Sequence, residues 1–368
     1  MTQTQSRKKN LFQMNVDLMH GPIFRSLVLF MLPILISNLF QQLYNTVDTM
    51  IVGNVLGDTA LAAIGSCGAI YELLVGFGLG IGNGLAIVAA RAYGAQDENL
   101  LKRTVAGSLV IGLVASLTIT TAGFFGLRPL LELLDTPAEI LEDAYRYIII
   151  IDLGVIVMFA YNLCAGLLRA IGNSKVPLFF LVFSACLNVV LDLLLILCFH
   201  MGVAGAAIAT NISQGVSAVL CLIYIYKNVP VLCPERTQWR LSASDTAYQM
   251  RMGIPMALQF SITASGAMVM QAAINLFGSV AVAAFTAASK LQNLVMQGMI
   301  AMGQTMATYS GQNFGKGDLA RIRKGVRASL SASAVYAVAV ALLVWILLKP
   351  CLGLFFTADV NMSVMMPW

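Results

Sequence analysis

Long apolar stretches separated by short polar segments run along the whole chain. Nine of them reach the length of about 20 residues that an α-helix needs to cross a hydrocarbon core of about 30 Å. Backbone amides in lipid must pair within their own segment, and the alternating strands of about 10 residues that build a membrane barrel are absent. The pattern predicts an all-α polytopic membrane protein with about nine transmembrane helices. We place these at residues 24–51, 60–84, 105–127, 144–168, 176–199, 203–226, 250–275, 281–305 and 325–349.

Composition and charge distribution agree with this pattern. Only 11% of the 368 residues are charged and 59% are hydrophobic, whereas about 25% of the residues of a soluble domain are charged. Of the 22 Lys and Arg residues, 18 fall on one side of the predicted spans. Only Arg128, Arg146 and Lys349 fall on the other side, and Lys290 lies inside a span. The positive-inside rule therefore predicts a cytoplasmic N-terminus and an external 128–143 loop in the cytoplasmic membrane. The basic bias reflects topology and does not predict nucleic-acid binding.

Two segments of the chain resemble each other at an offset of 221–222 residues. Pro33 in the first span matches Pro255 in the seventh, and residues 82–94 match residues 303–315. An internal repeat of this size is typical of secondary transporters. Six spans separate the copies, an even number, so the two repeats are expected to be parallel and related by an axis along the membrane normal.

The repeat also predicts the domain organisation. The second copy ends three helices short of the first, so we expect two parallel six-helix repeats of which the second is truncated. The predicted parts are a cytoplasmic N-terminal segment (1–23), a six-helix lobe (24–227), a cytoplasmic linker (228–248) and an incomplete lobe of three helices (249–368).

Ionisable side chains inside the spans are candidates for function, because each costs about 2.5–3.5 kcal/mol on insertion scales. Asp48 follows Tyr44 by one helical turn, and Asp192 follows Asn188 by one turn. A rise of about 1.5 Å per residue places both aspartates in the outer half of the membrane, with Thr210 at a similar depth. Desolvation and mutual repulsion favour the protonated form of such a pair, so we expect a proton-carrying site. The alternative is a buried hydrogen-bonded network that only ties helices together.

The other polar residues of the spans carry weaker signals. Asp152 and Glu72 fit a helix interface as well as a wet cavity, and Asn162 fits a buried hydrogen-bonded network between helices as well as a functional site. In the eighth predicted span, one stripe carries Lys290 with several amide side chains. It predicts a mildly basic cavity wall, or a lysine that reaches back to an interface. The residues that we assign to this possible substrate cavity are Lys290, Asn293, Gln297 and Gln259.

Several classes of chemistry have no support in the sequence. The 7 cysteines are scattered without a CxxC pair, and the 2 histidines stand alone, so no metal site is expected. No phosphate-binding loop and no HExxH motif occur. We therefore expect neither an enzyme nor an ATP-driven pump, and the cysteines are best explained as small core residues.

The chain resembles the multidrug and toxic compound extrusion (MATE) family over essentially its whole length. The resemblance lies in the first-span motif of residues 41–53 (QQLYNTVDTMIVG), in Ala-Tyr-Gly-Ala at 92–95 and in Gly-Gln-Asn-Phe-Gly at 311–315. It implies twelve helices in two six-helix lobes around a central cavity. It also implies exchange of H⁺ or Na⁺ for cationic or amphiphilic drugs, with no cofactor besides that coupling ion.

Within this family the chain is similar to the DinF-like branch, which implies a cation site in the first lobe. Pro33 matches the proline that is proposed as the hinge of the first helix. Another branch uses a glutamate in the seventh helix for Na⁺, and this chain has Gln259 in that neighbourhood, so we expect that site to be absent. The cation-binding residues that the resemblance implies are Asp48, Asp192, Tyr44, Asn162, Asn188 and Thr210.

These observations lead to the hypothesis of a cation-coupled antiporter, with protons favoured over Na⁺ because the site is rich in carboxylates. Its expected partners are small cationic or amphiphilic substrates and membrane lipid, and no feature predicts an oligomeric state. One alternative is a lipid or polysaccharide flippase of the same superfamily, which should have more basic cavity residues than Lys290 alone. The other is a non-transporting fragment or membrane scaffold.

Overall fold

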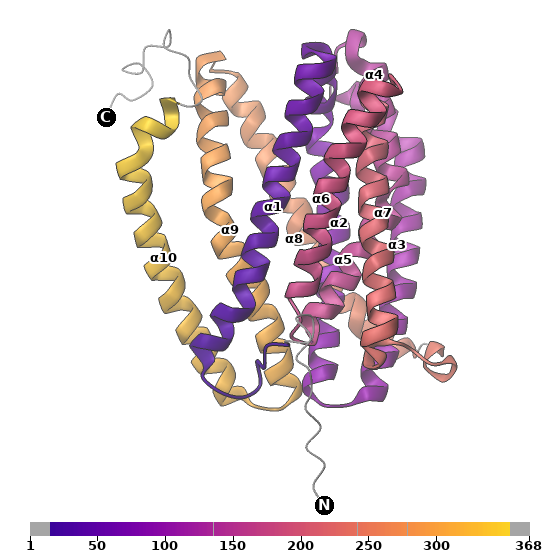
Figure 1. Ribbon diagram of the computed structural model, residues 1–368, viewed down its shortest axis with the longest axis vertical. Coiled ribbons are helices and arrows are strands. Elements are labelled where there is room, and N and C mark those ends of the chain that lie inside the picture. The colour runs from indigo at the N-terminus through magenta and orange to yellow at the C-terminus, as the bar shows by residue number, and fades with distance from the viewer. Residues whose placement is uncertain (1–14, 135, 241, 278, 354–368) are drawn as a thin grey trace, which may run out of the picture.

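The structure is a bundle of long helices (Figure 1). The computed structural model describes residues 15–134, 136–240, 242–277 and 279–353, and within these ranges it contains helices and no strand. The predicted all-α class is therefore confirmed. The first six spans are built from α1 (Ile23–Leu56), α2 (Asp58–Gly94), α3 (Glu98–Leu133), α4 (Ala138–Leu153), α5 (Val155–Ala170), α6 (Lys175–Leu193) with the π-turn η1 (Leu194–Cys198), and α7 (Gly202–Asn228). After the short turns η2 (Pro230–Leu232) and η3 (Arg236–Trp239) follow α8 (Ala243–Asn275), α9 (Ser279–Gly315) and α10 (Leu319–Gly353).

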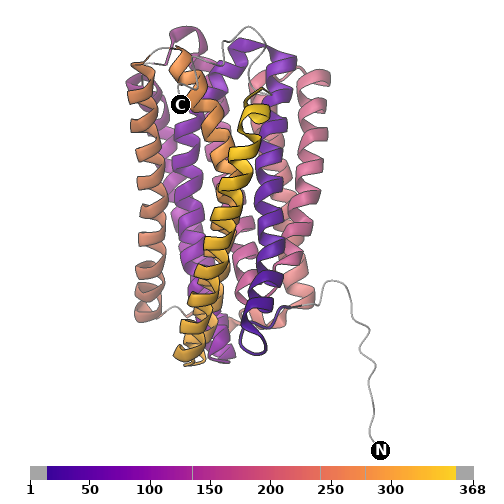
Figure 2. The same cartoon turned by 90° about the vertical axis from the view of Figure 1, so that its left-hand side faces the viewer.

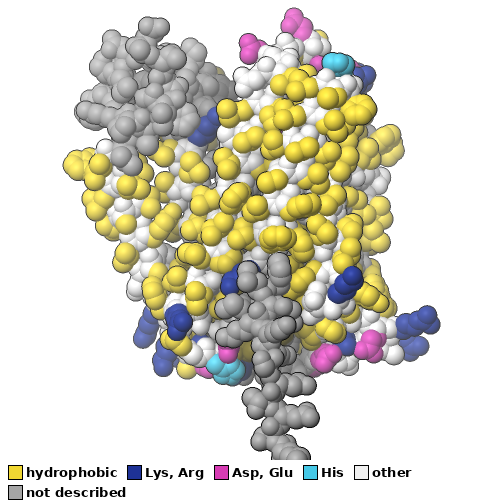
Figure 3. All heavy atoms as spheres, viewed as in Figure 1, with side chains coloured by type: hydrophobic (Ala, Val, Ile, Leu, Met, Phe, Trp, Pro, Cys, Tyr) yellow, Lys and Arg dark blue, Asp and Glu magenta, His cyan; other side chains and the backbone are white. Residues whose placement is uncertain are grey.

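Most of these helices meet the requirements of a membrane span. In the described part of the chain, seven are long and apolar enough to cross a bilayer, and the bent pair of α4 and α5 makes an eighth if the two helices cross as one span. The remaining long helix, α9, has 37 residues but carries the polar stripe predicted from Lys290 to Gln297. On the face that Figure 3 shows, hydrophobic side chains cover the side of the bundle, while most of the charged side chains lie toward its two ends.

The two ends of the bundle differ in charge. Lys and Arg gather where α1, α3 and α10 begin, and we name this the basic end. The acidic end is where α3 meets α4, and Arg128 there pairs with Glu132 and Glu142 at 3.6 and 3.7 Å. This distribution follows the predicted charge asymmetry. Which end faces the cytoplasm stays a prediction.

The predicted span 144–168 is not one continuous helix, and this is a correction. The chain bends by 45° between α4 and α5, at Gly154. The side chain of Asn211 in α7 lies at this break, where its Nδ2 donates to the carbonyl of Ile150 at 2.5 Å. A Cβ at Gly154 would lie only 2.0 Å from Asn211 Oδ1, so only glycine allows this approach.

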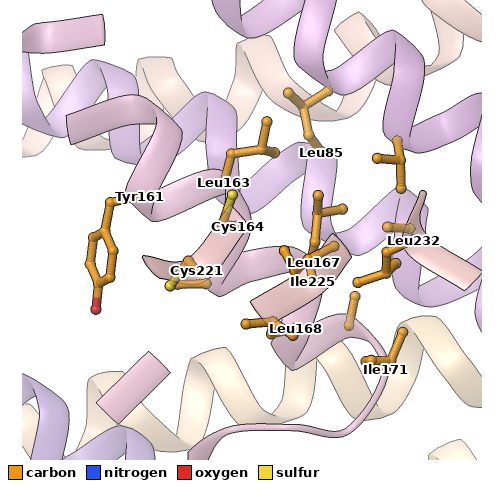
Figure 4. Packing of buried hydrophobic residues seen from close by; sticks show 14 of the residues in the cluster. Leu85, Tyr161, Leu163, Cys164, Leu167, Leu168, Ile171, Cys221, Ile225 and Leu232 are labelled. Carbon is orange, nitrogen blue, oxygen red and sulfur yellow. The ribbon is translucent and has the colours of Figure 1, made fainter. Parts of the chain in front are cut away.

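Helix α5 occupies the middle of the first lobe, where its apolar side chains pack against α2 and α7 (Figure 4). Leu163, Leu167 and Leu168 are at most 2% exposed. The free thiols of Cys164 and Cys221 lie in the same core, which agrees with their prediction as small core residues. This core fixes α7 beside α6 and thereby positions the polar residues that both helices carry.

Helices α8 and α9 join the first lobe near the basic end. A Cβ at Gly80 of α2 would lie 2.4 Å from the Cα of Ala257, and one at Gly84 would lie 2.6 Å from the Cα of Gly253. The glycine ladder of α2 therefore lets α8 approach backbone to backbone. Farther along, Phe260 of α8 still packs on Gly76 of α2, where a Cβ would lie 3.4 Å from the Cβ of Phe260, while Ile262 on another face of α8 is 70% exposed. In Figure 1 the ends of α8 and α9 that lie toward the acidic end stand apart from α1, and Figure 2 looks onto α10 in front of the bundle.

Candidate functional site

Two carboxyl groups meet between α1 and α6 in the half of the bundle nearer the acidic end. The side chain of Asp48 in α1 lies within hydrogen-bonding distance of Asp192 in α6. Asp192 and its neighbour Asn188 are fully buried, and Asp48 is partly buried. Helical spacing in α6 puts Asn188 and Asp192 on one face, as the sequence predicted.

A short hydrogen-bonded chain connects this pair to α7. The Tyr44 hydroxyl, one turn before Asp48, donates to Thr210 Oγ1 at 3.2 Å. With its nitrogen toward Asp192, the Asn188 amide donates to Asp192 Oδ2 at 2.8 Å and accepts from the Thr210 N–H at 3.3 Å. In the opposite amide orientation Asn188 Nδ2 points at Thr210 Oγ1, at 3.5 Å. Three helices thus share one polar cluster made of Tyr44, Asp48, Asn188, Asp192 and Thr210.

The cluster has unused acceptor atoms. Asp48 Oδ1 and Asp192 Oδ1 are buried and have no hydrogen-bond partner. Among the described residues no Lys or Arg pairs with either carboxylate. Two ionised carboxylates in contact repel each other, and burial adds a desolvation cost. A proton held between them, or a desolvated cation bound to them, removes both penalties.

Two tyrosines that the sequence analysis missed lie near the pair. The hydroxyls of Tyr71 in α2 and Tyr147 in α4 interact electrostatically with the charge of Asp48. Both side chains belong to the apolar cluster around Cys67 and Val52. In the sequence each is a single tyrosine in an apolar span, and no spacing relates it to Asp48.

Two residues that were predicted for this site do not bond to the carboxyl pair in the structure. Asn162 Nδ2 donates to the carbonyl of Met158 in its own helix at 2.8 Å. Pro33 is buried within α1, which continues through it, and the Ser37 hydroxyl donates to its carbonyl at 2.8 Å. A cation-binding role for Asn162 and a hinge role for Pro33 stay predictions.

The residues assigned to a substrate cavity lie on α8 and α9 and form no common network. Lys290, Asn293 and Gln259 are exposed, whereas Gln297 is buried and donates to the carbonyl of Asn293 in its own helix at 3.1 Å. Lys290 has no ion pair in the described part of the chain. An exposed, unpaired lysine on a lobe face is compatible with a cavity wall, and that role stays a prediction.

A third buried acid stands apart from the cluster. Asp152, at the end of α4, is fully buried, and neither of its carboxylate oxygens has a hydrogen-bond partner. Its side chain packs on Gly123 of α3, where a Cβ would lie 2.2 Å from Asp152 Oδ2. Thr120 of α3 donates to the backbone carbonyl of Asp152 at 3.0 Å, so α3 hydrogen-bonds to the backbone of Asp152 and not to its carboxyl group.

Comparison with known proteins identifies related chains. The MatE family model matches two segments, residues 33–194 and 255–365. The probable multidrug resistance protein YpnP of Bacillus subtilis (strain 168) is 32% identical over 308 residues, which cover 83% of this chain and 68% of that protein. The probable multidrug resistance protein YoeA of the same strain is 27% identical over 349 residues, which cover 93% of this chain and 75% of that protein. A crystal structure of MATE in complex with MaL6 has the same fold, with a TM-score of 0.89 and 22% identity over 96% of this chain and 78% of that one.

Proposed function

The chain belongs to the MatE family of multidrug efflux transporters, and we propose that it is a cation-coupled antiporter of the cytoplasmic membrane that exports cationic or amphiphilic drugs, with the proton as its favoured coupling ion. The observation that carries this proposal is the contact between Asp48 and Asp192. Each has a buried oxygen without a hydrogen-bond partner, and no basic side chain among the described residues neutralises them.

The contact suggests how a proton is exchanged for a substrate. With one proton shared, Asp48 and Asp192 hold α1 against α6. Without it, two negative charges at the same place repel and favour separation of the helices. Because α1 also lines the region between the lobes, a change in its packing alters the surface that a substrate meets. Binding of a cationic substrate and release of the proton are then coupled through the position of α1.

The energetics of such an exchange are sufficient for efflux. A proton that moves down 100 mV and one pH unit supplies about 3.7 kcal/mol. That supports a gradient of roughly 500-fold for a neutral drug. For a monovalent cationic drug exchanged one for one, the electrical contributions cancel and only the pH difference remains.

Transport in proteoliposomes tests the proposal. The purified chain is reconstituted, and uptake of a fluorescent cationic dye is followed while a pH gradient or a Na⁺ gradient is imposed separately. We expect uphill transport on the pH gradient, and its loss in Asp48→Asn and in Asp192→Asn. Asp152→Asn is the matched control, since it removes a buried acid of the same lobe that lies outside the cluster. Transport on a pH gradient that survives Asp192→Asn would contradict the proposal.

A further inference from the structure

The segment that precedes α1 is held in place by hydrogen bonds, although it belongs to no helix. Asp17 Oδ1 accepts from the backbone N–H groups of Met19 and His20 at 2.9 and 3.0 Å, which folds the chain into a turn. The side chain of Leu18 is 1% exposed and belongs to the apolar cluster between α1 and α9. In Figure 1 the segment crosses the basic end of the bundle before it enters α1 beside α10. We name residues 16–21 the strap.

The second lobe holds the strap through α9 and α10. Arg321, in the first turn of α10, donates to the backbone carbonyls of Leu18, His20 and Gly21 at 3.3, 2.9 and 3.1 Å. Asn313 in α9 is fully buried, and its Nδ2 donates to the carbonyl of Leu18 at 3.1 Å. Two side chains of the second lobe thus bind three carbonyl groups of the strap.

The first lobe holds the other end of the strap. The Val16 N–H donates to the carbonyl of Gly172, in the loop between α5 and α6, at 2.9 Å. Gly172 has a φ of +89°, and a Cβ there would lie 2.5 Å from the carbonyl oxygen of Val16. Only glycine combines this left-handed backbone with such a close approach. The strap therefore joins a loop of the first lobe to two helices of the second.

A direct bond between the lobes lies in the same region. Gln312 of α9 is 1% exposed, and its Nε2 donates to the carbonyl of Ala170 at 2.7 Å. At the offset of 221 residues, Gln312 and Asn313 stand where the first copy has Arg91 and Ala92. Ala92 has no polar group, so α2 cannot form the counterpart of the Asn313 bond. The contacts of the strap and loop, and not the repeat, therefore explain this pair of amides.

The strap has no slack between its two attachments. Val16 and Leu18 are two residues apart, and two residues reach at most about 7 Å. Transporters built from repeats alternate access by rocking one repeat against the other. Opening the basic end moves the α5–α6 loop away from α9 and α10, so the strap cannot stay bonded to both lobes.

We propose that the strap holds the basic end of the transporter closed, and that its release from Gly172 or from Arg321 is a required step in opening that end. The strap then sets how often the basic end opens, at a place remote from the carboxyl cluster. Its action depends on alternating access of the lobes and not on the identity of the coupling ion. It can therefore fail or hold separately from proton exchange at Asp48 and Asp192.

The labelling rate of a buried thiol tests this role. Thr308 is buried one turn before Gln312 in α9, so Thr308→Cys in a cysteine-free background reports opening of the basic end. Arg321→Gln removes three bonds to the strap, and Gly172→Ala adds a methyl group that meets Val16. Each should raise the rate of maleimide labelling of the detergent-purified protein by about 10-fold or more, since hydrogen bonds to a charged donor are stronger than neutral ones.

Hydrogen exchange of the strap shows whether opening proceeds through it. The Val16 N–H should exchange faster in Arg321→Gln by a similar factor, although Arg321 bonds to the other end of the strap, because the two attachments are coupled. Faster labelling of the Thr308→Cys thiol with unchanged exchange of the Val16 N–H would overturn the proposal, since the lobes would then separate without the strap.

Matched controls separate release of the strap from general destabilisation. Gly317→Ala places alanine at a similar φ of +82°, with nothing within 4 Å of its Cβ. Arg323→Gln removes an exposed guanidinium two residues from Arg321. Both controls should be labelled like the wild type. Labelling that is unchanged in Gly172→Ala and Arg321→Gln would overturn the proposal, and so would equal acceleration in the two controls.

Discussion

Gly94 at the end of α2 and Gly315 at the end of α9 make equivalent contacts where these two helices cross at the basic end of the molecule. A Cβ at Gly94 in α2 would lie 1.9 Å from the carbonyl oxygen of Gln312, and one at Gly315 in α9 would lie 2.0 Å from that of Arg91. The two contacts are related by the same offset of 221 residues that relates the repeats. Each helix end therefore packs directly on the backbone of the other. A side chain in place of either glycine would force the two lobes apart.

Substitution of either crossing glycine should destabilise the protein to a similar extent. Gly94→Ala and Gly315→Ala are each expected to cost about 1–3 kcal/mol, because the added methyl group must displace backbone atoms. Gly82→Ala and Gly303→Ala are matched controls in the same two helices, where a Cβ would meet nothing within 4 Å. There alanine should be neutral or slightly stabilising. The midpoint of thermal unfolding in detergent distinguishes the pairs, and equal effects at all four positions would contradict the crossing.

The Tyr44 hydroxyl is expected to tune the carboxyl cluster without carrying the proton. Tyr44→Phe removes the hydrogen bond to Thr210. A neutral hydrogen bond contributes about 0.5–1.5 kcal/mol, so its loss should change drug affinity by about 2- to 10-fold. Drug affinity measured at pH 6 and at pH 8 should still differ in this variant, but the difference between the two affinities should be smaller than in the wild type by that factor. Tyr226→Phe is the control, since that side chain is 78% exposed. Complete loss of the pH dependence in Tyr44→Phe would make the phenol itself the proton carrier.

The buried Asp152 should be dispensable for both folding and transport. Leucine has the same branching as aspartate and removes a buried polar group that has no partner, so Asp152→Leu is expected to raise the thermal midpoint. Dye transport on a pH gradient should persist. A lower midpoint combined with lost transport would show that the carboxyl group gains a partner during the transport cycle.

The orientation of the protein in the membrane can be determined by thiol labelling. In a cysteine-free background, Glu139→Cys at the acidic end should react with an impermeant maleimide from outside intact cells. Arg236→Cys at the basic end should react only after the membrane is opened. Both positions are exposed in the structure. The reverse pattern would invert the topology that the charge asymmetry predicts.

Much of the fold could be predicted because membrane helices have a strong local signal. Apolar runs located the spans, and helical spacing placed Asn188 and Asp192 on one face of α6. Helical rise placed Asp48 and Asp192 at a similar depth. The structure adds that these carboxyl groups are in contact across two helices.

The features that sequence reasoning missed depend on contacts between distant segments. Gly154, where α4 and α5 bend, lies against the side chain of Asn211, which belongs to another helix. Tyr71 and Tyr147 interact with the charge of Asp48 only once α2 has packed on α1 and α4 on α2. The bond of Asn162 to its own helix depends on the rotamer chosen in the packed lobe. None of these contacts leaves a periodic pattern.

The most direct test of the central claim is the number of protons released when a cationic drug binds. Calorimetric titration of the purified protein near neutral pH, in buffers of different ionisation enthalpy, yields this number. If Asp48 and Asp192 share the coupling proton, the wild type should release about one proton per bound drug, and Asp192→Asn should bind the drug with almost no release. Proton release that is unchanged in Asp192→Asn would contradict the account.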